Sequence, residues 1–173
     1  MTQQKLAAEA APARQSDVLL LRDIAFDDVA RLLARYGVYL APVEDAALIP
    51  GSYWGEPEAG VIANVVYARN DTPVHSVLHE AAHLIVLPTE RRSAVHTDAT
   101  DSIDEEDAVC VLQALLGDAL PGVSRDRIHA DMDAWGYTFR LGSARAYFEH
   151  DAETAWQWLL ARGLIDSQRQ LLR

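Results

Sequence analysis

The stretch HSVLHEAAHLIV, residues 75–86, places three histidines and one glutamate among apolar residues. Burying ionisable side chains costs free energy unless something pairs with them. Thr72 suits the N-cap of a helix, Pro73 suits its first position, and Pro88 suits its end. The sequence therefore predicts one helix of about four turns that carries all of these polar groups.

Within this helix, residues 79–83 read His-Glu-Ala-Ala-His, an H-E-x-x-H pattern. Residues four apart lie on one face of a helix, so the imidazoles of His79 and His83 can approach one ion. Glu80 is offset from that face, within reach of a metal-bound water. Two nitrogen ligands, a general base and an open position are what a zinc hydrolase requires. By chance the pattern arises about once in a hundred such chains, the false-positive risk of a short motif.

A third protein ligand is needed to hold zinc. The three-histidine form of the motif is excluded because positions 86 and 89 are Val and Thr. A carboxylate from the following predicted helix is the remaining common choice. Helical phase favours Glu105, because it shares a face with three apolar residues that we expect to point inward: Val109, Leu112 and Leu116.

Other roles and other ligands stay open in this segment. Ser102 and Glu105 match a capping box, in which the glutamate would bond the N–H of the cap instead of a metal. Glu106 shares a face with Cys110 and Gln113 and looks more exposed. The acidic neighbours of Glu105 remain alternative ligands: Asp104, Glu106 and Asp107.

His75 lies one turn before His79 on the same face. Along the helix axis it is about 12 Å from His83, too far for both to share one ion easily. We interpret His75 as a polar residue of a solvated first turn. Peptide hydrolysis also requires a donor for the developing oxyanion, and the sequence offers three candidates that it does not rank: Tyr53, Tyr137 and His150.

The 173 residues suffice for one domain, which we expect over residues 17–173 after a flexible tail at 1–16. The net charge of −11 argues against direct nucleic-acid binding. Cys110 is the only cysteine, which excludes an internal disulfide. The N-terminus lacks the apolar region of a secretory signal, and no apolar run has the length of a membrane span. We therefore expect a cytoplasmic protein.

Outside the motif, residues 26–37 predict an amphipathic helix with a glycine stop. Residues 38–43 and 61–68 predict two strands, separated by a loop over 49–60 that is rich in Gly and Pro. Ser102, Ser124 and Ser143 look like the caps of three later helices, of which the last is expected to run to Gly163.

Several of these features together resemble a known family. They are the glycine-punctuated loop, the strand VIANVVYA, HEAAH on a helix, and residues 105–108 (Glu-Glu-Asp-Ala) with Leu115-Leu116 ahead of a proline. This order resembles the ImmA/IrrE-type zinc metallopeptidases, the gluzincin-like DUF955 group, over roughly residues 35–121. HEAAH is the most specific element. Val109 and Val111 depart from the Asn and the aromatic residue of the family pattern E-x-x-A-N-x-F-A.

The resemblance implies an α+β fold: a small mixed sheet packed with helices, a zincin-like active-site helix followed by a ligand-bearing helix, and a helical C-terminal part. It implies zinc held by His79, His83 and Glu105, with Glu80 activating water. The implied reaction is hydrolysis of a peptide bond in a protein or peptide substrate, and the family's targets include transcriptional regulators. No helix-turn-helix module accompanies the domain, so the metal site carries over better than the regulatory partner.

Two alternatives remain open. Two histidines and one carboxylate also suit iron, as in non-haem iron hydroxylases. The second alternative is an inactive zinc-containing binding module. In such a module a fourth protein ligand would close the metal site. The local candidates for that ligand are His75, His96, Asp98 and Asp104.

Overall fold

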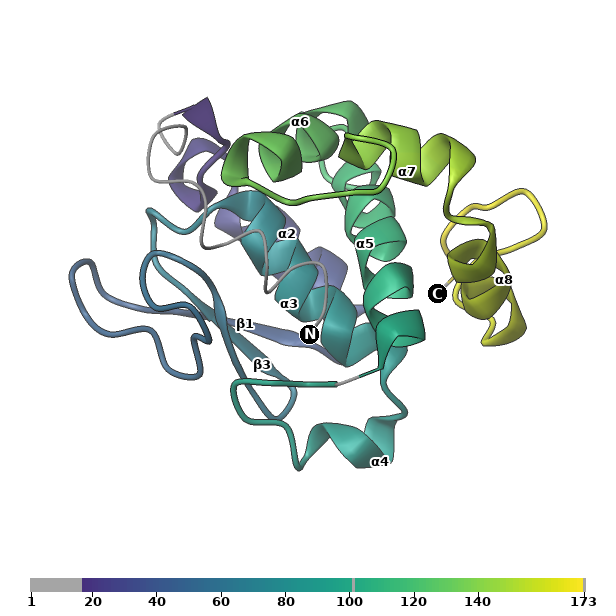
Figure 1. Cartoon of the computed structure of the whole chain (residues 1–173). Helices are drawn as coiled ribbons and strands as arrows, with labels where there is room; N and C mark the ends of the chain where they lie inside the picture. The colour runs from purple at the N-terminus through teal and green to yellow at the C-terminus, as the bar shows by residue number, and fades with distance from the viewer. Residues whose placement is uncertain (1–16, 101, 173) are drawn as a thin grey trace.

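The computed structural model describes residues 17–100 and 102–172. The expected tail, residues 1–16, lies outside the described residues. The described chain is a mixed α+β structure with a small mixed sheet, as expected (Figure 1). Its elements, in chain order, are η2 (Leu21–Asp23), α2 (Phe26–Ala34), β1 (Tyr39–Pro42), β2 (Gly60–Ile62), β3 (Val65–Ala68), α3 (Val74–Val86), α4 (Thr89–Arg92), α5 (Ile103–Asp118), α6 (Arg125–Trp135), α7 (Ala144–His150) and α8 (Glu153–Ala161).

The sheet has the strand order β1-β3-β2. β1 pairs with β3 in parallel, and β2 pairs with β3 antiparallel, with Ile62 opposite Val65. The single strand expected over 61–68 is therefore a hairpin of two strands. Ala63 turns the chain between them with a φ of 51°, in the left-handed region that a regular strand does not use.

Helix α3 contacts β3 of the sheet and packs beside α5 (Figure 1). Every residue of α3 except Glu80 is buried, because the helix has neighbours on nearly all sides. The expected cap is wrong by one residue. Pro73 is the N-cap, and the Thr72 hydroxyl instead accepts a hydrogen bond from the Arg69 backbone N–H at 2.9 Å.

Helix α5 is the centre of the helical layer, since it contacts α3, α6 and α8. It begins after Ser102, whose hydroxyl accepts from the Glu105 N–H at 3.4 Å, so this predicted cap is confirmed. Gly117 permits a close approach to α6, because a Cβ at this position would lie 2.5 Å from Cγ1 of Ile128. α5 therefore has buried residues on several faces.

The C-terminal helices begin at the predicted serines. The hydroxyls of Ser124 and Ser143 cap α6 and α7. The helix expected to run to Gly163 is instead divided, since α7 ends at His150 and α8 begins at Glu153. The indole N–H of Trp156 donates to the carbonyl of Phe148 at 3.4 Å, which satisfies one of the groups exposed where α7 ends.

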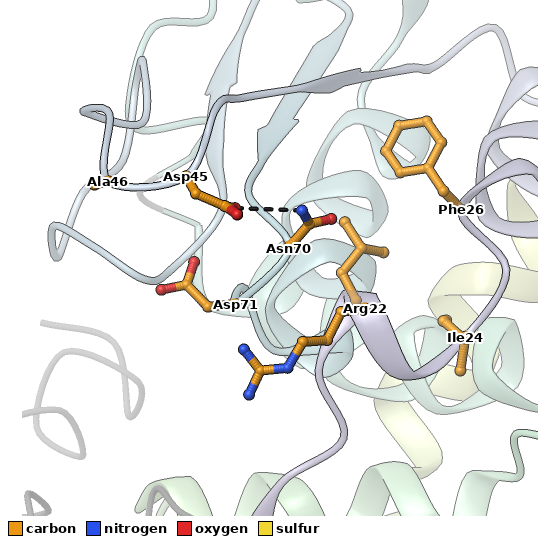
Figure 2. A pocket seen from close by; sticks show the side chains of 8 residues that line it. Arg22, Ile24, Phe26, Asp45, Ala46, Asn70 and Asp71 are labelled. Carbon is orange, nitrogen blue, oxygen red and sulfur yellow. Dashed lines mark hydrogen bonds between the residues drawn. The ribbon is translucent and has the colours of Figure 1, made fainter.

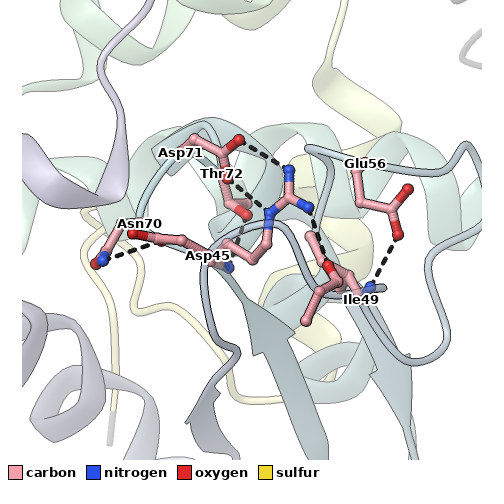
Figure 3. A network of polar contacts seen from close by, with 8 residues as sticks. Asp45, Ile49, Glu56, Asn70, Asp71 and Thr72 are labelled. Carbon is pink, nitrogen blue, oxygen red and sulfur yellow. Dashed lines mark hydrogen bonds and ion pairs between the residues drawn. The ribbon is translucent and has the colours of Figure 1, made fainter.

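A polar network fixes the long loop between β1 and β2 (Figure 3). Arg69 donates to both carboxylate oxygens of Asp71 at 2.8 Å and to the carbonyl of Ala47 at 2.9 Å. Within the loop, Glu56 accepts from the backbone N–H of Ile49 at 2.9 Å. These bonds hold the loop beside the start of α3. In the described part of the chain, no helix has both the length and the apolar character to cross a membrane.

Candidate metal centre

Three side chains from α3 and α5 converge on one point. His79, His83 and Glu106 each offer one ligand atom, and these atoms all lie within 4.8 Å of one another. The Nε2 atoms of the two histidines are 2.9 Å apart, and Nε2 of His83 is 3.2 Å from Oε1 of Glu106. Both imidazoles are buried, with 1% and 6% of their surface exposed. The group could hold a metal ion.

The chemistry of this group fits a divalent cation. Two imidazole nitrogens and one carboxylate oxygen are ligands that zinc accepts, and ligands about 2.1 Å from a tetrahedral ion lie roughly 3.4 Å apart. Two imidazole lone pairs that face each other at 2.9 Å repel unless a proton or a cation lies between them.

The two histidines differ in their electrostatic surroundings. Burial, and to a lesser degree the neighbouring His83, lowers the pKa of His79 to about 4. Burial also acts to lower the pKa of His83, but its hydrogen bond to Glu106 and the charges of Glu106, Glu80 and Asp98 together raise it. The carboxylate of Glu106 therefore favours the protonated form of His83 when no metal is bound.

The structure selects Glu106, and not Glu105, as the candidate third ligand. The Glu105 carboxylate binds Arg91 instead, with Oε1 3.0 Å from Nη1. The prediction from helical phase was misled because α5 is buried on more than one face. The face of Glu106 and Gln113 that looked exposed in the sequence packs against α3, and Gln113 is fully buried.

The remaining acidic candidates lie outside this group. Asp104 is exposed, and Asp107 is also absent from the group of three ligands. The predicted capping box is only half formed, since Ser102 caps the helix but its own N–H donates to the Thr100 hydroxyl.

Glu80 lies on α3 between the two histidines. Burial raises the pKa of its carboxyl group to about 8; His83 opposes this shift, and the charges of Glu58, Glu106 and Asp98 add to it. A carboxyl group tuned close to neutral pH suits a general acid-base role. A divalent cation at the adjacent histidines would favour its ionised form.

A second half-buried carboxylate, which belongs to no sequence motif, lies near Glu80. Glu58, at the end of the loop before β2, accepts a hydrogen bond from the Trp135 indole N–H at 2.6 Å. Burial raises the pKa of Glu58, and its charge contributes to the raised pKa of Glu80. Glu58 therefore helps to keep Glu80 in its protonated form when no cation is bound.

The solvated first turn that we expected for His75 is wrong. His75 is 1% exposed, and its ring packs against Trp135 and Tyr137 with centroid separations of 5.2 and 5.6 Å. The Tyr137 hydroxyl is 3.5 Å from Nδ1 of His75. The first turn is covered because the end of α6 and the segment that follows it fold over it.

Of the three possible oxyanion donors, Tyr137 lies beside the metal centre, where its ring is 6.0 Å from that of His79. Burial raises the pKa of its hydroxyl well above the ordinary value, so the group stays a neutral donor. Tyr53 is 44% exposed in the loop before β2. His150 is exposed at the end of α7 beside Glu149.

The residues considered as a fourth ligand do not join the group of three. His96 is exposed, and its Nδ1 lies 2.8 Å from the Thr97 hydroxyl. Asp98 is near enough for its charge to act on Glu80 and His83, but it is not part of the group. His75 and Asp104 are not part of it either.

A surface pocket of about 500 Å³ lies elsewhere, where the segment before α2 meets the turn before α3 (Figure 2). Inside it, the Asn70 amide donates to Asp45 at 3.2 Å. Its lining contains none of the metal-centre residues and consists of Leu21, Arg22, Ile24, Phe26, Asp45, Ala46, Asn70 and Asp71.

Comparison of the chain with models of protein families, with curated proteins and with solved structures gives no significant match. The resemblance to the ImmA/IrrE-type metallopeptidases therefore stays a prediction from the sequence motifs, and the metal centre rests on its own geometry.

Proposed function

We propose that this chain is a zinc-dependent hydrolase that cleaves peptide bonds, with the metal held by His79, His83 and Glu106. The observation that carries the proposal is the convergence of both H-E-x-x-H imidazoles with a carboxylate from the next long helix. A structural zinc site normally has four protein ligands, whereas a catalytic site has three and an open position. Among the described residues the group has three ligands, and Glu80 directly follows one of them, His79, in the sequence; both features favour the catalytic type.

The arrangement of the elements supports a zincin-like fold. The helix that carries the motif lies against a small sheet, and the helix that carries Glu106 packs along it. Ligands on two long, buried helices are held more rigidly than ligands on loops, which a catalytic metal site requires. Trp135, at the end of α6, packs on His75, and Tyr137, just after α6, lies beside His79.

When bound, zinc would supply Lewis-acid chemistry, polarising the substrate carbonyl and lowering the pKa of a water molecule towards neutrality. Glu80 would accept the proton of the attacking water and pass it to the leaving amine. Tyr137, a neutral donor, would give its hydroxyl hydrogen bond to the carbonyl oxygen as negative charge develops there. In the structure this hydroxyl lies 3.5 Å from Nδ1 of His75 and also interacts with the side chain of Gln113, so it would exchange these contacts for the substrate oxygen.

The test begins with the full chain purified without added metal. Elemental analysis should find about one zinc per chain, since the group contains a single set of ligands. The zinc-loaded protein should cleave members of a library of fluorescence-quenched peptides. Glu80→Gln should retain zinc and lose turnover by roughly 100-fold or more, as expected for loss of a general base.

Three results would overturn this proposal, and each points elsewhere. Iron in place of zinc would favour the hydroxylase alternative, because two histidines and one carboxylate also suit iron. Bound zinc without cleavage of any peptide would favour a binding module. Full activity of Glu80→Gln would remove Glu80 from the mechanism.

A further inference from the structure

Besides Glu106, Gln113 is a polar side chain of α5 that contacts the motif helix. It is fully buried. Its amide nitrogen lies 2.9 Å from the backbone oxygen of His75, and its amide oxygen lies 3.0 Å from Nδ1 of His79. Both ends of the Gln113 amide therefore contact α3: one end contacts the main chain, and the other contacts a candidate metal ligand.

The chemistry of these two partners fixes the direction of the amide. The two ends of a glutamine amide have nearly the same shape, so their partners decide which is oxygen and which is nitrogen. A backbone carbonyl only accepts hydrogen bonds, so the amide end that faces the oxygen of His75 must be the NH₂ group. The amide oxygen then faces His79 and must receive a hydrogen from Nδ1.

From this chain of contacts we infer that Gln113 is a positioning residue, which holds His79 in the tautomer that carries hydrogen on Nδ1 and leaves the Nε2 lone pair for the metal. Nε2 is the atom of His79 that faces Nε2 of His83 in the group of three ligands. The inference rests on the proposed metal centre. It adds a residue that the H-E-x-x-H pattern does not contain.

His83 provides an internal contrast. Its Nδ1 atom is buried and has no hydrogen-bond partner among the described residues, so no neighbour fixes the tautomer of His83 in the same way. The two motif histidines therefore differ: His79 is held through Nδ1 by Gln113, whereas His83 is oriented through Nε2 by Glu106. Loss of the Gln113 acceptor should change His79 and leave His83 unaffected.

The experiment compares the full chain with Gln113→Leu, which cannot accept, and Gln113→Glu, which keeps an acceptor. Val111→Ala is the matched control, because Val111 is also fully buried on α5 but lies about 200° around the helix from Gln113. Long-range ¹H–¹⁵N spectra of the metal-free proteins report the tautomer of His79. Competition with a chromophoric chelator reports the dissociation constant for zinc.

We expect the Nδ1–H tautomer of His79 in the wild type, in Gln113→Glu and in Val111→Ala, and a mixture of tautomers in Gln113→Leu. Zinc affinity should fall about 10–100-fold in Gln113→Leu, the usual effect of losing a side chain that hydrogen-bonds to a metal ligand. The affinity should fall by less than this in Gln113→Glu and in Val111→Ala. An Nε2–H tautomer in the wild type would overturn the inference, and so would a Gln113→Leu variant with unchanged tautomer and affinity.

If Gln113→Leu does not fold, the wild type and Gln113→Glu still decide the tautomer. If the wild type binds no zinc, the proposed function fails, whereas the tautomer in the metal-free protein remains readable.

Discussion

The Nε2 atom of His83 lies 3.2 Å from Oε1 of Glu106, although the two residues belong to different helices. This contact identifies the carboxylate that completes the metal group, and it separates Glu106 from its neighbour Glu105. Substitution of each glutamate by glutamine keeps the shape of the side chain and removes its charge. The pair therefore tests the ligand assignment directly.

We expect Glu106→Gln to weaken zinc binding by at least about 100-fold. This is more than the loss of a residue that only hydrogen-bonds to a metal ligand would cause. Glu105→Gln should change the affinity only a few-fold, because it loses a pair with Arg91, whose side chain is half exposed. Competition with a chromophoric chelator measures both affinities. Equal losses in the two variants, or a larger loss in Glu105→Gln, would return the assignment to Glu105.

The sequence predicted the motif helix well, because Pro73, Pro88 and the apolar residues between them act locally. The third ligand depended on which face of α5 turns towards α3. Periodicity does not settle that for a helix buried on several sides, where Val111 and Gln113 are both fully buried although they lie about 200° apart around the helix. Only the tertiary packing of α3 and α5 brings Glu106 to the histidines.

Other errors have a similar origin. The hairpin turn at Ala63 lies within a run of β-branched residues that contains no glycine or proline to mark it. A first helical turn is usually solvated, but the end of α6 and the segment that follows it cover His75. Glu58 and Gln113 belong to no motif, so their roles depend on contacts that form only in the folded chain.

Tyr137→Phe should lower turnover by roughly 100-fold with unchanged zinc content, because the variant keeps the ring and loses the donor to the developing oxyanion. Tyr147→Phe is the control. Its hydroxyl donates to the carbonyl of Asp107 at 3.0 Å, so that variant should lose about 1 kcal/mol of stability and retain its activity. Peptide cleavage and urea denaturation of both variants measure these effects. Full turnover by Tyr137→Phe would exclude Tyr137 as the donor.

His75→Phe should make the metal-free protein less sensitive to acid. Burial lowers the pKa of His75 to about 3, from an ordinary value of 6.5. Between these values the unfolded chain binds a proton that the folded chain does not, so stability falls with falling pH by about 1.4 kcal/mol per unit. From pH 6.5 to pH 5, the wild type should therefore lose about 2 kcal/mol more than the variant. Urea denaturation with a chelator present measures the difference, and parallel losses in both proteins would show that His75 titrates normally.

Glu80→Gln should remove an opposite dependence at higher pH. Burial raises the pKa of Glu80 from 4.5 to about 8, so between these values the folded chain keeps a proton that the unfolded chain has lost. The stability of the metal-free wild type should therefore fall as the pH rises through this window, by up to a few kcal/mol in total. The glutamine variant carries no titrating group at this position, so the difference between the two proteins isolates Glu80 from the other residues.

Saturating zinc should reduce the difference, because a neighbouring cation favours the ionised carboxylate. Urea denaturation at pH 5, 6.5 and 8, with and without zinc, measures all of these terms. A wild type and a variant that stay parallel without metal would show that the Glu80 carboxyl is ionised at neutral pH before any cation binds.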